Sequence, residues 1–447
     1  GQVNTPGTYT LSSLATPINA LYAAGGPSEN GSFRSIELVR NGKTITTLDV
    51  YEFLLQGKNK QVFLQDNDVP IPESVLNALP VLDTNQLGRV VHKHTEMDGL
   101  PDLDGIQVAL IGVQEDRRAY RNVGCDGAAD AIRPYLYQLY TGNWDFQIAD
   151  LGNLYKGEQH YDTIAALKDI TEELLQRNII VITIGGSQEL TYGAYRAYDK
   201  LEQTVNVVSV DARLDVGAEG RDLDHQSYVS HLVLQKPHNL YNFTNLGYQT
   251  YFNNPEEINL IDKLFFEAVR LGEIQNQIGK TEPFLREADL VSIDLGAVRQ
   301  SYNPGTFYTS PHGLSGAELC AITRYAGMSD KLTQLGLFEY NPRLDHRGQS
   351  AHLCAHALWY FFEGISLRFG DYPVGSRADY QKYTVLIDEN DEVNFFKSPK
   401  SGRWWIEIPK GTPDQNRTTL VPCAYEDYEE ALQGTLPARW WKAQQKA

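Results

Sequence analysis

Three short polar clusters follow apolar stretches of the sequence, and they hold the residues best suited to chemistry. The clusters are Gly185-Gly186-Ser187-Gln188, Asp211-Ala212-Arg213-Leu214-Asp215 and Ser292-Ile293-Asp294-Leu295-Gly296. Their three aspartates, with Gln188 or Glu318, could offer one hard cation such as Mg²⁺ or Ca²⁺ an oxygen-rich site. Arg213 lies among them, and a guanidinium has no lone pair for a metal and stays charged at any relevant pH. The clusters therefore indicate either a cation site or a group of carboxylates compensated by an internal cation.

Each cluster lies at the end of a stretch with the composition of a buried strand. Nearly continuous apolar runs, as expected of strands covered on both faces, occupy Ile106–Val113, Asn178–Ile184, Val205–Val210 and Asp289–Asp294. Amphipathic helical stretches separate them, and Asp162–Arg177 is the clearest. The alternation predicts an α/β fold, with a mostly parallel sheet between two layers of helices and its functional edge at the carboxyl ends of the strands.

The order of the three clusters resembles that of the signature motifs of the ureohydrolase family, which includes arginase, agmatinase and formimidoylglutamase. Flanking segments that agree with the family are Asn122-Val123-Gly124, Asp150-Leu151-Gly152-Asn153, Asn303-Pro304-Gly305-Thr306 and Phe338-Glu339-Tyr340-Asn341-Pro342. The resemblance covers residues 105–365, is strongest to the formimidoylglutamase branch and implies a three-layer α-β-α domain. It also implies hydrolysis of C–N bonds in linear amidines by two Mn²⁺ ions, which two histidines and four aspartates would hold.

The chain departs from the family's pattern of metal ligands. By the resemblance, Ser187 and Gln188 stand where an aspartate and a histidine are expected. Arg213 replaces the second histidine and Gly296 replaces one aspartate, so three of the six ligands remain. We expect the manganese pair to be absent and Arg213 to act as an internal counter-ion, with forked hydrogen bonds to the remaining aspartates. This pattern predicts no metal cofactor, and it assigns no catalytic residue.

An active enzyme is the alternative. A single Mg²⁺ or Ca²⁺ among the remaining aspartates would give a C–N hydrolase with an atypical metal site. Glu318 looks like the family residue that pairs with the amidine nitrogen of the substrate, although it could equally cap or solvate its helix. His225, His231 and His238 follow the second cluster, where relatives often carry a proton shuttle, and the sequence does not choose between them.

The first stretch, residues 1–69, has the features of a small separate module. Asn41-Gly42 is a strong hairpin signal between Ser35–Arg40 and Thr44–Leu48. Together with NTPGTYTL near the start, these motifs resemble the soluble-ligand-binding β-grasp (SLBB) module of polysaccharide-export proteins. The resemblance implies a packing or oligomerisation element of cell-envelope exporters.

Two further segments flank the central domain. Residues 70–104 predict a proline-containing linker with a short helix near Glu73–Leu79. Residues 366–447 contain short apolar stretches separated by turn residues, so we expect a small antiparallel sheet there. Its two tandem pairs, Trp404-Trp405 and Trp440-Trp441, predict either an exposed protein interface or a core that anchors this extension.

The overall composition limits the classes of function. The chain has 447 residues and a formal net charge of −18 at pH 7. Such a charge argues against nucleic acid as a partner, because phosphate binding needs a basic face. No apolar run approaches the ~18 residues of a membrane-spanning helix. The four cysteines are scattered, and we expect buried free thiols rather than disulfides.

The sequence supports three hypotheses for function. The leading hypothesis is a catalytically inactive ureohydrolase-like protein that acts as a binding or assembly component, through a protein partner or self-association. The second is an active C–N hydrolase of the formimidoylglutamase or agmatinase type with an atypical metal site. The third, a cell-envelope polysaccharide-export component, depends on residues 1–69 alone. The central domain predicts a cytoplasmic protein, whereas a native N-terminal module would favour the periplasm or the cell envelope.

Overall fold

The structure is a computed structural model. It describes residues 4–5, 21, 24–25, 36–40, 43–48, 68–201, 203–218, 220–373, 377–387, 392–410 and 417–446. The chain divides into two compact units, Gly1–Asp68 and Val69–Ala447. In the first unit, β1 (Ile36–Arg40) and β2 (Lys43–Leu48) form an antiparallel pair, which confirms the hairpin predicted around Asn41-Gly42. Most other residues of this unit lie outside the described ranges, so its SLBB-like character stays a prediction.

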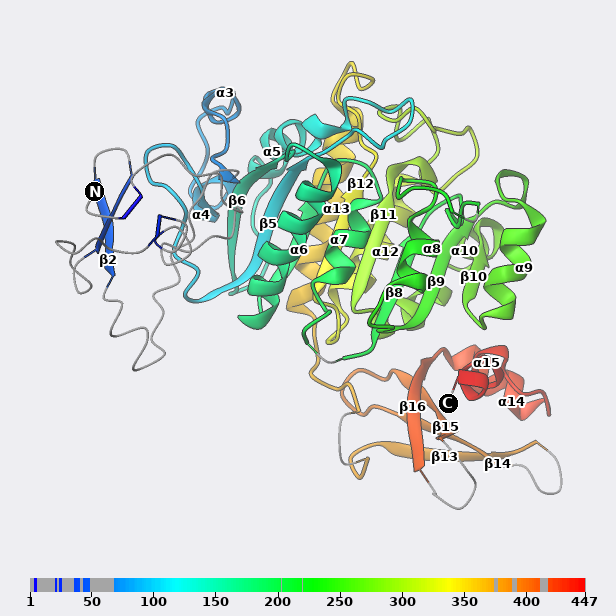
Figure 1. Cartoon of the computed structure of the whole chain (residues 1–447). Coiled ribbons are helices and arrows are strands. Elements are labelled where there is room, and N and C mark those ends of the chain that lie inside the picture. The colour runs from blue at the N-terminus through cyan, green and yellow to red at the C-terminus, as the bar shows by residue number, and fades with distance from the viewer. Residues whose placement is uncertain are drawn as a thin grey trace. The chain divides into compact units, whose positions relative to one another are not determined.

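A parallel β-sheet forms the centre of the second unit (Figure 1). Its strands are β4 (His92–Lys93), β5 (Ile106–Gln114), β6 (Gln147–Tyr155), β7 (Ile180–Ile184), β8 (Val205–Val210), β9 (Leu240–Tyr248), β10 (Glu267–Arg270), β11 (Leu290–Asp294) and β12 (Gln334–Phe338). In space they follow the order β10-β9-β8-β11-β12-β7-β5-β6, and β4 pairs with β6. All of these pairs are parallel, as predicted, and β4 extends the sheet into the segment expected to be a linker.

Helices cover both faces of this sheet and complete the predicted three-layer arrangement (Figure 1). One hydrophobic cluster packs the sheet against α5 (Ala128–Tyr137), α10 (Leu271–Asn276), α11 (Glu282–Glu287), α12 (Gly316–Gly327) and α13 (Gln349–Ser366). The other packs it against α6 (His160–Gln176), α7 (Leu190–Arg196), α8 (Tyr228–Leu234) and α9 (Pro255–Lys263). Two short helices, α3 (Glu73–Asn77) and α4 (Leu87–Val90), precede the long strands. In the described part of the chain, no helix has the length and apolarity to cross a membrane.

The strand β8 shows why these segments are apolar at almost every position. Val205 and Val207 pack in the cluster of α6 and α7, whereas Val208 and Val210 pack in the cluster of α12 and α13. Successive side chains of a strand point to opposite faces, so a strand between two helical layers buries both sets. The polar residues that end such strands therefore gather at the edge of the sheet.

Residues after α13 form a small antiparallel sheet followed by two helices, which confirms the β-rich extension. Its elements are β13 (Gln381–Leu386), β14 (Glu392–Lys397), β15 (Trp404–Lys410), β16 (Arg417–Cys423), α14 (Tyr425–Leu432) and α15 (Ala438–Lys446). Trp404 and Trp405 are buried, and Trp440 Nε1 donates to Glu407 O at 3.0 Å. Trp441 is 49% exposed. The tryptophans therefore mainly form the core of the extension.

Arg286 of α11 attaches this extension to the central domain. Its guanidinium donates to Trp404 O at 3.0 Å and to Cys423 O at 2.9 Å, and it lies 4.6 Å from the centre of the Trp405 ring. It also pairs with Glu282 at 3.1 Å, and only 2% of Arg286 is exposed. The side chain thus replaces water as the partner of two backbone carbonyls that belong to different strands of the extension.

Helix α15 adds a second attachment. Lys442 Nζ donates to Phe266 O at 2.9 Å and pairs with Glu267 at 3.0 Å, where β10 begins. Lys446 Nζ donates to Asn242 Oδ1 at 2.5 Å near the start of β9. Since α11 directly precedes β11, these contacts all lie near the amino-terminal ends of strands.

We expect Arg286→Ala to lower the free energy of unfolding by about 2–4 kcal/mol, because it leaves two buried carbonyls without their cationic partner and leaves Glu282 paired with Arg403 alone. The measurement is urea unfolding followed by tryptophan fluorescence. The matched control, Arg177→Ala, removes an arginine at the end of α6 whose ion pair among the described residues is with Glu173, and it should cost less than about 1 kcal/mol. Equal midpoints for the two variants would contradict the anchoring role.

Candidate metal centre

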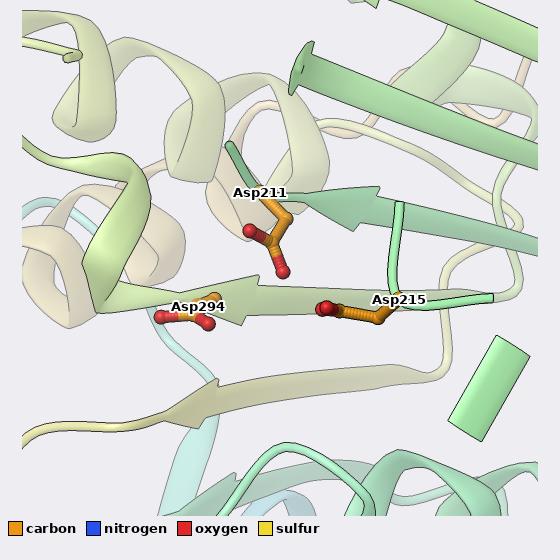
Figure 2. A group of neighbouring side chains, drawn as sticks. All are labelled: Asp211, Asp215 and Asp294. Atoms are coloured by element: carbon orange, nitrogen blue, oxygen red, sulfur yellow. The ribbon is translucent and has the colours of Figure 1, made fainter. Parts of the chain in front are cut away.

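Three aspartates meet at the carboxyl-terminal edge of the parallel sheet (Figure 2). Asp211 directly follows β8, Asp294 is the last residue of β11, and Asp215 lies in the loop after β8. One carboxylate oxygen of each lies within 4.8 Å of the others, and all three residues are buried. Because β8 and β11 are neighbours in the sheet, their ends bring these residues together, as the sequence predicted.

Four adjacent strands contribute to this edge. In sheet order, β8 ends just before Asp211, β11 ends at Asp294, β12 ends just before Glu339, and β7 ends a short turn before Gln188. A tight turn after β7 brings the last of these back over the sheet, and Gly186 adopts a φ of 71° in that turn. A Cβ on Gly186 would lie 2.5 Å from Glu115 O, so only glycine allows the backbone to approach so closely.

Burial and mutual repulsion make the three carboxyl groups unusually basic. Burial raises the pKa of Asp211 well above its usual range, and the charge of Asp215 raises it further. The pKa of Asp294 rises in the same way, through burial and then through the charges of Asp211 and Glu339. Burial also raises the pKa of Asp215 to about 8. The cluster therefore needs protons or a cation at neutral pH, since buried carboxylates in contact cannot all stay charged without compensation.

The amide of Gln188 contacts the cluster and has partners in either of two orientations. With Nε2 toward the carboxylates, it donates to Asp211 Oδ2 at 2.9 Å and to Asp215 Oδ2 at 3.3 Å, and Oε1 accepts from the Tyr228 hydroxyl at 3.2 Å. With the amide turned over, Oε1 joins the carboxylate oxygens and Nε2 faces two buried serine hydroxyls at 3.3 and 3.4 Å. The second orientation completes a set of four oxygens, the donor type that hard divalent cations prefer.

Arg213 does not form the predicted bonds to the aspartates. Its backbone N–H donates to Asp211 Oδ1 at 2.8 Å, but its guanidinium makes no ion pair with a carboxylate of the described residues. The guanidinium instead lies 4.8 Å from the centre of the Phe252 ring and 5.8 Å from that of Tyr308, and Nη1 donates to Phe252 O at 3.2 Å. The predicted forked hydrogen bonds are therefore wrong, because aromatic faces and a carbonyl hold the cation at the pocket wall.

The other two altered positions have local structural roles. Ser187 Oγ donates to Glu189 Oε1 at 2.6 Å, and both side chains are buried. Gly296 N donates to Asp294 Oδ1 at 2.5 Å, and a Cβ on Gly296 would lie 2.9 Å from the same oxygen. An aspartate at this position would therefore require Asp294 to move.

Glu318 belongs to the start of its helix. Its Oε2 accepts from Ser315 N at 2.6 Å while the Ser315 hydroxyl accepts from Glu318 N, so the two residues form a capping box for α12. The carboxylate that the sequence analysis missed is Glu339, which is fully buried. Its Oε1 accepts from Gln188 N at 3.0 Å and its Oε2 from Asn122 Nδ2 at 2.7 Å. Its position directly after an apolar strand was the available signal.

His225 is the histidine that reaches the pocket. Its Nδ1 lies 3.5 Å from Glu339 Oε1, and its ring packs 5.2 Å from that of Tyr308. Burial acts to lower the pKa of His225, but Glu339 and other nearby carboxylates outweigh burial and raise it. Its buried Nε2 has no hydrogen-bond partner within the described ranges. His231 bonds a backbone carbonyl, and His238 is exposed, so neither matches this arrangement.

A small pocket lies among these residues, next to the three aspartates. We call its three buried aspartates the acidic floor (Asp211, Asp215 and Asp294); the other lining side chains include His225, Arg213, Phe252 and Tyr308. The floor could hold a divalent cation beside a histidine with a free nitrogen. Those are the components of metal-assisted hydrolysis.

Comparison with known proteins agrees with this arrangement. A sequence model of the Arginase family matches residues 106–363, which is more than half of the chain. Among curated proteins, the chain is similar to a formimidoylglutamase of Lysinibacillus sphaericus (strain C3-41). The two are 22% identical over 295 residues, which cover 62% of this chain and 91% of the relative.

Solved structures share the fold at low sequence identity. Formimidoylglutamase from Bacillus subtilis subsp. subtilis str. 168 superposes with a TM-score of 0.58 and 19% identity, over 65% of this chain and 95% of that one. Trypanosoma cruzi formiminoglutamase with Mn²⁺ gives a TM-score of 0.56 and 18% identity, over 64% and 99%. At such identities the likeness establishes the three-layer fold.

The expectation that the chain has no metal cofactor is wrong. It equated the loss of three ligand positions with the loss of the whole site. The remaining aspartates instead converge with their oxygens within 4.8 Å, and the T. cruzi relative with this fold was solved with Mn²⁺. The donor set that remains, carboxylates with an available amide oxygen, fits a hard divalent cation.

In protein stripped of divalent cations, we expect the melting temperature to fall between about pH 6 and pH 9. The pKa values of the floor aspartates are raised in the folded state, so the folded protein binds more protons than the unfolded chain. The resulting stability is complete below about pH 4 and is lost as the pH rises through the folded values, about 8 for Asp215. Added Mn²⁺ should restore the melting temperature most strongly at the alkaline end, where it no longer competes with protons.

Scanning fluorimetry across this pH range, with and without Mn²⁺, measures both effects. The comparison variant is Asp294→Asn, which removes one floor carboxylate and keeps its shape. Its melting temperature should depend less on pH and respond less to Mn²⁺. A wild-type melting temperature that ignores both pH and cation would contradict the electrostatic account.

Proposed function

Because the chain belongs to the arginase family, we propose that it is a metal-dependent hydrolase of C–N bonds in linear amidines. The convergence of the acidic floor carries this proposal, since three buried carboxylates within 4.8 Å of one another need a cation to stay ionised. The similarity to formimidoylglutamases supports the same reaction class. The hypotheses of an inactive binding protein and of an export component, and the expected partner or self-association, stay predictions.

The acidic floor and Gln188 would hold one divalent cation. In the described ranges, Asp211, Asp215 and Asp294 are the only group of three metal-ligating side chains. Arg213 and Gly296 offer no ligand atom to a second ion. We therefore infer a site for a single cation, in contrast to the pair that the sequence resemblance implies.

The cation and the protein residues would have separate roles in the reaction. A bound divalent cation supplies Lewis-acid chemistry, which polarises the amidine and increases the acidity of water. Glu339 Oε1 lies 3.5 Å from His225 Nδ1 and orients the ring, so the free Nε2 can accept or deliver a proton in the pocket. Protonation of the leaving nitrogen is the step that such a group assists in C–N bond cleavage.

We expect the full chain to release a nitrogen product from at least one of formiminoglutamate, agmatine and arginine when Mn²⁺, Mg²⁺ or Ca²⁺ is present. Chelation should abolish this release, and Asp294→Ala should lower kcat/KM by about 100-fold or more, which corresponds to about 3 kcal/mol. Assays of ammonia, urea and formamide provide the measurement. Asp199→Asn is the control, because that aspartate pairs with Arg196 outside the pocket. No turnover of any compound with any of the three cations would overturn the proposal and favour the inactive binding protein.

Gln188→His should change which cation the site prefers. An imidazole nitrogen suits Mn²⁺ better than Mg²⁺, whereas an amide oxygen suits hard cations. We expect the ratio of Mn²⁺ to Mg²⁺ affinity, measured by titration calorimetry, to rise by about 10-fold or more in this variant. Gln188→Ala should weaken both cations without raising the ratio. An unchanged ratio in Gln188→His would place the Gln188 side chain outside the ligand set.

A further inference from the structure

The Arg213 guanidinium lines the pocket and interacts electrostatically with Asp211 and Asp215, but it makes no hydrogen bond or close ion pair to them. The residue is half-buried and lines the same pocket as the acidic floor. Its side chain makes one hydrogen bond, from Nη1 to Phe252 O at 3.2 Å, and no ion pair with a carboxylate of the described residues. A guanidinium carries five N–H donors, so most of its hydrogen-bonding capacity is available to a ligand.

The structure holds this guanidinium in place. The aromatic rings of Phe252 and Tyr308 lie 4.8 and 5.8 Å from it, and ring faces attract a guanidinium while leaving its N–H edge open. The backbone is also fixed on both sides. Arg213 N donates to Asp211 Oδ1 at 2.8 Å, and Arg213 O accepts from Asn245 Nδ2 at 2.7 Å. The cation therefore has a defined position relative to the acidic floor.

Charge is distributed unevenly around the pocket. The floor is acidic and buried, whereas Arg213 is closer to solvent. Arg121 is an exposed cation nearby, 5.6 Å from the Phe307 ring, which in turn packs against Tyr308. Arg121 also lacks an ion pair within the described ranges. The pocket and its surroundings therefore combine buried carboxylates with two arginines that make no ion pair within the described ranges.

We propose that Arg213 binds a carboxylate of the substrate and thereby selects amidines that carry a carboxylate over amidines that carry a second positive charge. A carboxylate is planar and accepts two parallel N–H bonds from a guanidinium, which matches the open edge that the aromatic rings leave. The identification of the other end as an amidine rests on the proposed function. On this account, a residue that stands at a metal-ligand position of the family determines specificity in this chain.

The test compares two amidines of similar length that differ in the group at the far end. 4-Guanidinobutanoate ends in a carboxylate, and agmatine ends in an ammonium group. Titration calorimetry of the full chain should show that 4-guanidinobutanoate binds at least about 10-fold more tightly, as expected of a charge-assisted pair. Arg213→Ala and Arg213→Gln should both abolish this preference. Arg213→Gln retains much of the side-chain volume, and it keeps the test valid if the alanine variant fails to fold.

Arg177→Ala is the matched control, because it removes one positive charge from the end of α6, where Arg177 pairs with Glu173. It should keep the wild-type preference. Equal binding of the two compounds by the wild-type chain, no binding of either, or a preference that survives in Arg213→Gln would overturn the inference.

Turnover assays of the same samples separate this inference from the proposed function. A preference that depends on Arg213, with neither compound hydrolysed, would support the anion site and contradict the hydrolase. Hydrolysis with a preference that is the same in wild type and Arg213→Gln would support the hydrolase and overturn the anion site. Hydrolysis with a preference that Arg213→Gln abolishes supports both.

Discussion

Mutual repulsion between three buried carboxylates is the constraint on which the site depends. Asp211, Asp215 and Asp294 are removed from water and lie too close to remain charged alone. Their burial is energetically tolerated only when protons, hydrogen-bond donors or a cation compensate the negative charge of the carboxylates. The Gln188 amide can meet either need, because its nitrogen can donate to the carboxylates and its oxygen can join them around a cation. The same pocket can therefore persist without a metal and still be ready for one.

The parallel sheet creates this constraint. Four adjacent strands end at the same edge, and each is followed by or ends in one polar residue of the site. The helical layers on both faces of the sheet exclude water from this region. The family resemblance draws attention to the lost ligands, whereas the geometry shows what the replacements do. Arg213 stacks on aromatic rings, and Gly296 lets Asp294 bond its own turn. The pocket thus has an acidic interior and a cation at its side.

Strands could be predicted from the sequence because burial on both faces makes them continuously apolar, as in Val205–Val210, where the predicted and observed bounds coincide. The convergence of the three clusters could also be predicted, because each cluster lies at the end of one of these apolar strands. Side-chain directions could not be predicted. Arg213 has carboxylates two residues away on either side, yet its guanidinium packs on the rings of Phe252 and Tyr308 instead. No local sequence pattern indicates that these distant rings lie beside it. Glu339 was missed because it directly follows a strand and looks like part of the strand motif. Its backbone φ of 63° ends the strand and directs the side chain toward the site.

The C-terminal extension is attached at the far ends of the strands. Arg286 and the lysines of α15 make their contacts near the starts of β9, β10 and β11, whereas the acidic floor lies where β8 and β11 finish. The whole length of the strands separates the two regions. A macromolecule docked on the extension would therefore leave the route of a small molecule into the pocket unobstructed, and the chain could be tethered and chemically active simultaneously.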